Sequence, residues 1–344
     1  MSKVRLSNME LLRVIAMFMI LVIHANMVSI PKPSYIELAE QPYSVITRYF
    51  LESLGICGVN IFVLISGWFT IKTRAKSFLS FFFQILVLLG GVFFLFYVLG
   101  KTDLSSLKEV ILWTNKHWFI KSYLVLMIIA PILNTFVCHS TEKQIRLIIV
   151  GYFIFMCSYG WVGGAKYFYM NGYGPLLFIG LYLLAYYTHY YSKNAPYYIK
   201  KFFIFNRNID LLLYFTFVTI NTILGVLLLY LGKNSFSQIY AYVNPFTIIG
   251  ALYLLLFFSK LNIKTSRVIN MMGAGSFAVY LLHAQSELFH FFTYVVRRLY
   301  DNYNGILCVS TIFLFLVMVY FAAITIDLPR KWAWTKISNK YQIK

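Results

Sequence analysis

Two ionisable side chains, Arg13 and His24, stand inside the first long apolar stretch of the sequence. Eleven residues separate them, so on an α-helix they lie within roughly 20° of the same face and about 16 Å apart along the axis. Arginine binds phosphate groups, and histidine, with an ordinary pKa of ~6.5, is a natural general base near neutral pH. The pair therefore suits a long ligand such as a coenzyme A thioester, with its phosphates near Arg13 and its acyl carbon near His24.

A structural interpretation competes with this chemistry. Arg13 can pair with Glu10, three residues earlier, and extend toward the membrane surface. His24 can merely satisfy its hydrogen bonds near the end of the span. The two residues alone favour neither interpretation.

Four further ionisable residues, Glu52, Lys121, His283 and Glu287, fall inside apolar stretches. A charge there costs about 2.5–3.5 kcal/mol on insertion scales and is seldom accidental. Glu52 is expected to lie at the depth of His24 and to orient its imidazole as a second catalytic residue. Lys121 is expected to hold a polar acceptor or a developing oxyanion. His283 and Glu287 are predicted to share a helix face, either in the same cavity or, by preference, in a separate polar seam.

No metal site is predicted, because no Cys or His spacing suits a metal ion. The four cysteines are expected to be packing residues. His117 and His290 stand near the ends of apolar stretches, where an interfacial role is the simpler explanation.

The elements that must position these groups are membrane helices. The chain has 344 residues, of which 60% are hydrophobic and only 12% charged, and its mean hydropathy is +0.72. Soluble proteins are nearer half apolar and a quarter charged, so a soluble globule is excluded. The formal net charge of +19 is scattered between apolar stretches without a dense basic stripe, which argues against nucleic acid as a partner.

The apolar stretches predict an all-α integral membrane protein, one domain over residues 1–344. About 20 apolar residues cross a bilayer as a helix, whereas barrel strands would alternate in segments of about ten. The predicted spans are 9–28, 45–71, 78–99, 117–138, 146–163, 175–191, 211–232, 245–259, 272–296 and 306–326.

The distribution of Lys and Arg predicts the orientation of these spans. The loops on the side that holds both termini carry 19 of the 30 basic residues, and the opposite side carries nine. Basic residues are enriched in cytoplasmic loops, so both termini are expected in the cytoplasm. Most of the positive net charge then reflects the orientation of the spans in the membrane and does not indicate a ligand site. Loops 29–44 and 100–116 become the expected outer-face elements for recognising an acceptor.

Four motifs in register resemble the membrane-bound acyltransferase 3 family. The opening ELLRVIAMFMILVIH is similar to the family's signature of an Arg and a His separated by ten residues. GVNIFVLISGWF resembles its second-span motif, which ends in Ser-Gly-aromatic. HWFIKSYLVLMIIAPIL and SFAVYLLH resemble a Trp-aromatic span and a late Tyr-Leu-x-His segment. The similarity extends from about residue 5 to residue 326.

The resemblance implies O-acylation of bacterial cell-surface glycans, with acyl-coenzyme A, and acetyl-coenzyme A in particular, as donor. It implies that Arg13 and His24 are essential and that the turn at Ser66 and Trp68 helps to build the site, with Trp118 as a further site-shaping residue. Lys72, Arg74 and Lys76 stand where the family has arginines facing the donor, and the two lysines weaken the case for a bidentate phosphate contact. The expected location is a bacterial plasma membrane.

A different class of function stays open. A glycan exporter or flippase would use the same polar cavity as a pathway, and some chains that resemble this family are assigned to polysaccharide export. A structural subunit of an envelope-synthesis complex is a third hypothesis, which does not explain the charges inside the spans.

Overall fold

The structure, a computed structural model, describes residues 5–72, 74–163, 170–191, 196–233 and 236–342, and it is helical without a strand in these ranges. Lys166 and Lys193, two of the basic residues in the topology prediction, lie outside them. Within them, seven helices are long and apolar enough to cross a membrane: Ser7–Ser29, Pro42–Phe69, Ala75–Val98, Trp118–His139, Glu142–Val162, Arg207–Tyr230 and Gly305–Lys340.

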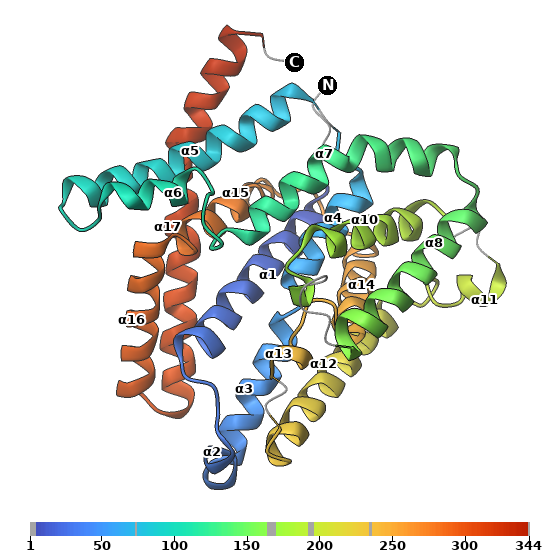
Figure 1. Cartoon of the computed structure of the whole chain (residues 1–344), viewed down its shortest axis with the longest axis horizontal. Coiled ribbons are helices and arrows are strands. Elements are labelled where there is room, and N and C mark those ends of the chain that lie inside the picture. The colour runs from blue at the N-terminus through green and yellow to red at the C-terminus, as the bar shows by residue number, and fades with distance from the viewer. Residues whose placement is uncertain (1–4, 73, 164–169, 192–195, 234–235, 343–344) are drawn as a thin grey trace.

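The helices follow one another through short connections (Figure 1). Their bounds are α1 (Ser7–Ile23), η1 (His24–Ser29), α2 (Tyr35–Glu40), α3 (Pro42–Gly55), α4 (Gly58–Phe69), α5 (Ala75–Val98), η2 (Leu104–Ser106), α6 (Leu107–Val110), α7 (Trp118–His139), α8 (Glu142–Phe155), η3 (Met156–Val162), η4 (Met170–Gly172), α10 (Pro175–Tyr190), α11 (Tyr197–Lys200), α12 (Arg207–Tyr230), α13 (Phe236–Ile239), α14 (Pro245–Ser259), α15 (Arg267–His283), α16 (Ser286–Asn302) and α17 (Gly305–Lys340).

Seven of the ten predicted spans correspond to these long apolar helices, two correspond to shorter helices, and one is divided. The stretches 175–191 and 245–259 form the shorter helices α10 and α14. The stretch 272–296 is not one helix, because α15 ends at His283 and α16 begins at Ser286. Gln285 starts the new helix, since its side-chain oxygen accepts a hydrogen bond from the Leu288 N–H at 3.1 Å.

Helix α1 passes through the middle of the molecule and packs against α15, α4 and α3 (Figure 1). Small residues permit this close approach, as is common where membrane helices meet. A Cβ atom on Gly58 would come within 2.7 Å of the Ala16 carbonyl oxygen, and one on Gly55 within 2.9 Å of the Met19 oxygen. Gly55 at the end of α3 and Gly58 at the start of α4 therefore allow both helices to lie close to α1.

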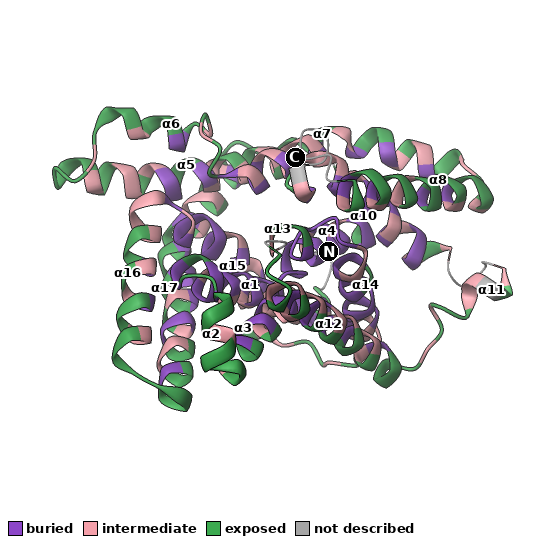
Figure 2. Ribbon diagram, turned by 60° about the horizontal axis from the view of Figure 1, so that its bottom comes forward, coloured by how far each residue is buried: buried purple, intermediate pink, exposed green. Residues whose placement is uncertain are grey.

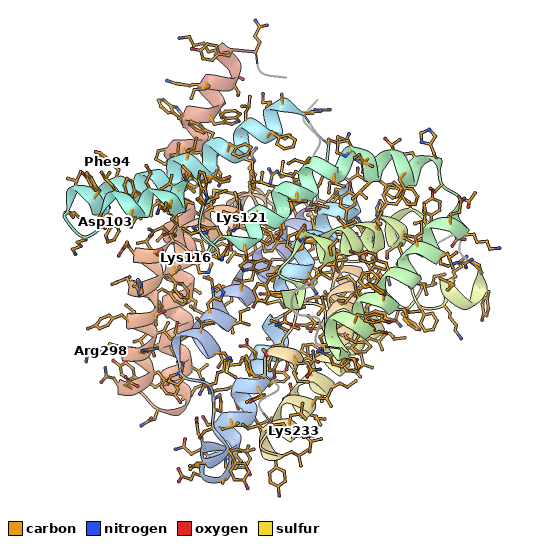
Figure 3. All side chains as sticks on the ribbon, viewed as in Figure 1. Phe94, Asp103, Lys116, Lys121, Lys233 and Arg298 are labelled. Atoms are coloured by element: carbon orange, nitrogen blue, oxygen red, sulfur yellow. The ribbon has the colours of Figure 1, made fainter. Side chains whose placement is uncertain are left out.

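Burial is concentrated in α1, α4, α14 and α15, while α5, α8, α16 and α17 carry wide exposed faces (Figure 2). On α5, α8 and α17 these faces carry many large apolar side chains: Phe94 on α5 is 67% exposed and lies at the periphery (Figure 3). Large exposed apolar side chains suit contact with lipid tails. Two of the ionisable residues that the sequence places in the spans, Arg13 and His24, face inward instead and line a cavity.

Candidate active site

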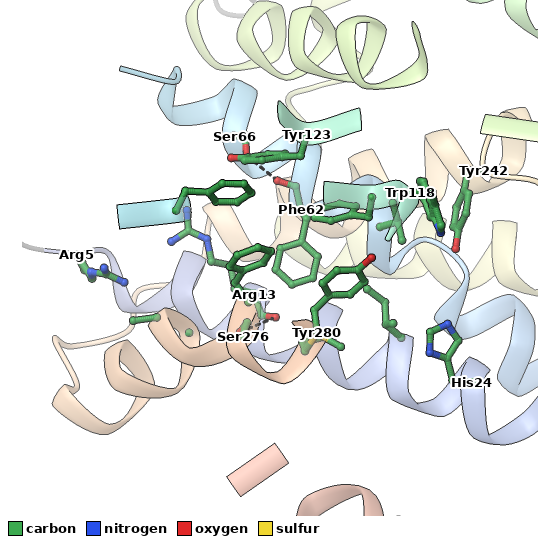
Figure 4. A pocket seen from close by; sticks show the side chains of 18 residues that line it. Arg5, Arg13, His24, Phe62, Ser66, Trp118, Tyr123, Tyr242, Ser276 and Tyr280 are labelled. Carbon is green, nitrogen blue, oxygen red and sulfur yellow. Dashed lines mark hydrogen bonds between the residues drawn. The ribbon is translucent and has the colours of Figure 1, made fainter. Parts of the chain in front are cut away.

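A cavity of about 310 Å³ lies between α1 and α15 on one side and α4, α5 and α7 on the other. Arg5 and Arg13 stand at one end, and His24 stands at the other end with Trp118 and Tyr242 (Figure 4). Arg13 and His24 thus line one continuous space, as the spacing of eleven residues on a helix requires.

The two arginines share a buried carboxylate. One Glu10 oxygen lies 2.5 Å from Arg13 and 3.4 Å from Arg5. The ion pair of the structural interpretation is therefore present, yet Arg13 also lines the cavity. Two guanidinium groups against one carboxylate leave this end with one excess positive charge, which favours an anionic ligand.

Helix α15 covers Glu10 closely. Gly273 faces it, and a Cβ atom there would lie 2.8 Å from the Glu10 carbonyl oxygen. The other Glu10 carboxylate oxygen is buried without a hydrogen-bond partner among the described residues. Glu10 is thus fixed beneath the arginines by packing as much as by charge.

His24 is held by a second histidine. Its Nδ1 lies 2.9 Å from Nε2 of His283, and Nδ1 of His283 lies 2.9 Å from the Val279 carbonyl oxygen. A carbonyl only accepts, so Nδ1 of neutral His283 carries its proton and its Nε2 accepts from His24. Nδ1 of neutral His24 is then the donor, and its Nε2 keeps a lone pair. This order of donors and acceptors makes His24 Nε2 a candidate base.

A change of helix type positions His24. The α-helical hydrogen bonding of α1 ends at Ile23, and a π-helical turn, η1, runs from His24 to Ser29. Ser29 Oγ donates to the His24 carbonyl oxygen at 2.9 Å, and Arg297 donates to the Ser29 carbonyl oxygen at 2.6 Å. Such π-helical turns are frequent at functional sites.

The wall between the two ends is aromatic. Phe81 stacks on Phe277 at 4.9 Å between ring centroids, and Phe119 stacks on Tyr123 at 5.8 Å. Ser66 lines the same wall, and its hydroxyl lies 3.0 Å from that of Tyr123. An apolar passage of this kind excludes water from whatever occupies it.

Glu52 is buried but has a different partner from the one expected. Its carboxylate accepts a hydrogen bond from Asn26 Nδ2 at 3.2 Å, and Arg48 donates to the Asn26 backbone carbonyl oxygen at 2.9 Å. His283, and not Glu52, orients the imidazole of His24. Glu52 therefore belongs to a polar network that joins Asn26 of η1 to the second half of α3.

His283 and Glu287 do not share a helix face, because the break at Ala284 and Gln285 separates α15 from α16. His283 contacts His24 at the end of the cavity. It therefore does not form a separate polar seam with Glu287. Lys121 donates to the Thr114 carbonyl oxygen at 2.8 Å and does not line the cavity described above. It secures the loop before α7 (Figure 3).

The basic cluster is also displaced from the cavity. Lys72 and Arg74 are exposed and Lys76 is partly buried, and none of them lines it. Trp68 packs on the His189 ring at 4.2 Å between centroids, outside the cavity, whereas Trp118 lines it.

His117 is fully buried, not interfacial. Its Nε2 donates to Glu109 at 3.0 Å, and Glu109 also accepts from the Ser286 N–H at 3.0 Å. Burial by itself would raise the pKa of Glu109, but the hydrogen bonds from His117 and Ser286 outweigh it and hold that pKa below its usual value. This cluster fastens α6 to the start of α16.

Sequence reasoning missed several cavity residues, among them Arg5, Tyr123 and Tyr280. Arg5 lies before the start of α1 at Ser7, so the periodicity of the helix does not relate it to Arg13. Tyr123 and Tyr280 stand inside two of the motifs that resemble the family, but nothing distinguishes them there from the many other aromatic residues in the spans.

Comparison with known proteins gives one match. The family model for the acyltransferase 3 family, described as an acyltransferase domain, matches residues 6–327. No curated protein and no solved structure shows significant similarity to the chain. Since the family match covers nearly the whole sequence and the long apolar helices fit a multi-pass membrane protein, this chain is a membrane acyltransferase that belongs to the acyltransferase 3 family.

Proposed function

We propose that the protein transfers an acyl group, acetyl in particular, from acyl-coenzyme A to a hydroxyl of a cell-envelope polysaccharide or glycolipid in a bacterial plasma membrane. The observation that carries this proposal is the position of His24, whose Nε2 lone pair is directed by His283 in a cavity that begins at Arg5 and Arg13. A phosphate-binding end and a base at the far end match a long thioester donor.

Donor binding is assigned to the arginine end. Arg5 and Arg13 would hold the phosphates of coenzyme A, and the aromatic wall would enclose its pantetheine arm and thioester. The bidentate geometry of guanidinium groups suits phosphate oxygens. The resemblance assigns donor binding to Lys72, Arg74 and Lys76 as well as to Arg13. The proposal assigns their part in donor binding to Arg5.

The proposed route is direct transfer with one base; an acyl-enzyme formed on His24 is the alternative route. His24 Nε2 accepts the proton of the acceptor hydroxyl while its oxygen attacks the thioester carbonyl carbon. The carbon–sulfur bond then breaks, the oxygen ester forms, and the imidazolium returns the proton to the departing coenzyme A thiolate. His283 accepts the hydrogen bond from His24 Nδ1 throughout and keeps the imidazole in one orientation.

The test is release of coenzyme A thiol from acetyl-coenzyme A by purified protein in nanodiscs, with extracted envelope glycan as acceptor and radiolabel followed onto the glycan. His24→Ala is expected to lower kcat by about 10²–10⁴-fold, the range for loss of a general base. His139→Ala is the matched control, because His139 is an exposed histidine at the end of α7.

Absence of any glycan-dependent thiol release by the wild-type protein would overturn the proposal. The exporter alternative would gain support if glycan movement across vesicles also survived His24→Ala. A transport pathway depends on the polarity of the whole cavity, whereas acyl transfer depends on this one base.

A further inference from the structure

Three aromatic rings from separate segments meet at the His24 end of the cavity. Trp118 begins α7, Tyr173 precedes α10, and Tyr242 lies between α13 and α14. The ring centroids of Trp118 and Tyr173 are 4.5 Å apart, those of Trp118 and Tyr242 5.4 Å, and those of Tyr173 and Tyr242 5.0 Å. We call these three residues the aromatic triad.

The aromatic triad connects the cavity with the surface. Trp118 and Tyr242 line the cavity, and Tyr173 is 39% exposed. In Figure 4 the indole nitrogen of Trp118 and the hydroxyl of Tyr242 are directed toward the side on which His24 lies. The Trp118 N–H has no hydrogen-bond partner within the part of the chain that the structure describes, so it is available to a ligand.

The backbone that carries the triad is held in an unusual conformation. Asn171 has φ of 55° and Gly172 φ of 91°, and the Tyr242 N–H donates to the Asn171 carbonyl oxygen at 3.0 Å. Ser122 donates to the Tyr173 carbonyl oxygen at 2.9 Å. A left-handed conformation of a residue other than glycine costs free energy and persists where surrounding contacts enforce it, often at functional sites.

We propose that the aromatic triad binds a sugar ring of the acceptor and presents one of its hydroxyls to His24. This inference rests on the proposed function, because it assigns the second substrate of that reaction. Sugar rings have a face of C–H groups and an edge of hydroxyls. Tyr and Trp have the complementary character, an apolar face with a polar edge. The triad offers both next to the candidate base.

The topology prediction places the triad on the side where an envelope glycan would be. The loops that precede Trp118, Tyr173 and Tyr242 are all expected on the outer face, opposite both termini. Arg5 and Arg13 lie at the other end of the same cavity (Figure 4). Donor and acceptor would then enter from opposite ends and meet at His24.

The experiment compares two acceptors in the acetyl-coenzyme A assay. One is extracted envelope glycan, quantified by sugar content, and the other is glycerol, which has hydroxyls but no ring. Tyr173→Ala is expected to raise the apparent KM for glycan about tenfold, as for the loss of one aromatic contact. The KM values for glycerol and for acetyl-coenzyme A are expected to change less than about twofold.

Conservative and distant variants complete the design. Tyr173→Phe retains the ring and is expected to keep the glycan KM near that of the wild type. Phe94→Ala removes an aromatic residue that is 67% exposed on α5, outside the triad and outside the loops expected to recognise an acceptor, and it is expected to leave all three KM values unchanged. Size-exclusion profiles confirm that each variant is folded.

Two failures can be told apart. Acyl transfer to glycan with the same KM in the wild type and in Tyr173→Ala overturns this inference and leaves the proposed function standing. No acyl transfer by the wild type to either acceptor overturns the proposed function, and this inference with it.

Discussion

At the scale of single residues, the His24–His283 pair is the feature that most resembles catalytic machinery. Val279 O accepts from His283, and His283 accepts from His24, so the direction of each hydrogen bond follows from one backbone carbonyl. A histidine fixed in one tautomer with a free nitrogen in a cavity is an efficient general base. His283 is therefore a positioning residue in the proposed reaction.

Substitution of His283 tests this role. His283→Leu is expected to lower kcat on the order of tenfold to a hundredfold. The variant lacks the acceptor that orients His24 through Nδ1, so part of the rate enhancement from general-base catalysis is lost. The KM for acetyl-coenzyme A should not change. His283→Gln keeps a side-chain oxygen that can accept and is expected to recover part of kcat. Equal kcat losses in both variants would point to a structural role alone.

A second prediction separates the two groups of basic residues. Arg5→Ala is expected to raise the KM for acetyl-coenzyme A about tenfold, since hydrogen bonds to charged groups contribute roughly 1.5–3 kcal/mol. Arg74→Ala is the matched control, because Arg74 is exposed and does not line the cavity. Steady-state kinetics at constant ionic strength measures both. The reverse result would restore the cluster at residues 72–76 as the donor site.

At the scale of elements, close helix packing depends on glycines. Helix α4 approaches α10 at Gly67, where a Cβ atom would lie 2.8 Å from the Tyr182 Cα and 2.9 Å from its carbonyl carbon. Backbone atoms cannot move aside as a flexible side chain can. The Ser-Gly-aromatic motif thus fixes a helix–helix distance, and Ser66 beside it reaches the cavity wall.

Gly67→Ala is expected to destabilise the protein by about 1–3 kcal/mol, the usual penalty for overpacking. Gly91→Ala is the control, because Gly91 is helical and a Cβ atom there would meet no atom within 4 Å. Alanine should be neutral or slightly stabilising at that position. Thermal unfolding of both variants in one detergent measures the difference, and an unchanged midpoint for Gly67→Ala would contradict the packing argument.

The contact of α6 with α16 should depend on pH. The pKa of Glu109 is lower in the folded protein than its usual value of 4.5, so the carboxylate contributes stability that is complete above pH 4.5 and is lost as the pH falls through its lowered pKa. Limited proteolysis of loop 100–116 should therefore accelerate with acid below pH 4.5. In the Glu109→Gln variant, loop 100–116 should be cleaved rapidly even at neutral pH, and the rate of cleavage should depend little on pH.

At the scale of the whole molecule, the two ends of the cavity differ in charge and in the type of side chain that lines them. Guanidinium groups stand at one end, and a histidine with aromatic rings stands at the other (Figure 4). In the proposed reaction this arrangement keeps donor and acceptor on separate sides of the membrane until they meet. The orientation of the chain therefore decides which substrate comes from which side.

Cysteine labelling tests that orientation. In a variant with all four native cysteines replaced by alanine, Trp113→Cys is expected to react with a membrane-impermeant maleimide added to intact cells. Asn339→Cys, near the end of α17, should react only after the membrane is permeabilised. Both positions are exposed, so accessibility within the protein does not limit the reaction. The opposite pattern would invert the topology.

The sequence by itself determined the class of the protein and the core of the candidate site. Composition and apolar stretches of about 20 residues require membrane helices, because the bilayer leaves few other structures. The spacing of Arg13 and His24 places them on one surface, because helix geometry is fixed by the backbone. These conclusions depend only on local periodicity.

Only the tertiary structure decided which residues meet between helices. His283 and not Glu52 lies against His24, Arg5 and not Arg74 borders the cavity, and a capped break divides the stretch 272–296. Such contacts join residues far apart in sequence, as His24 and His283 are by 259 positions. They depend on how helices rotate and pack against one another, which no local pattern in one sequence specifies.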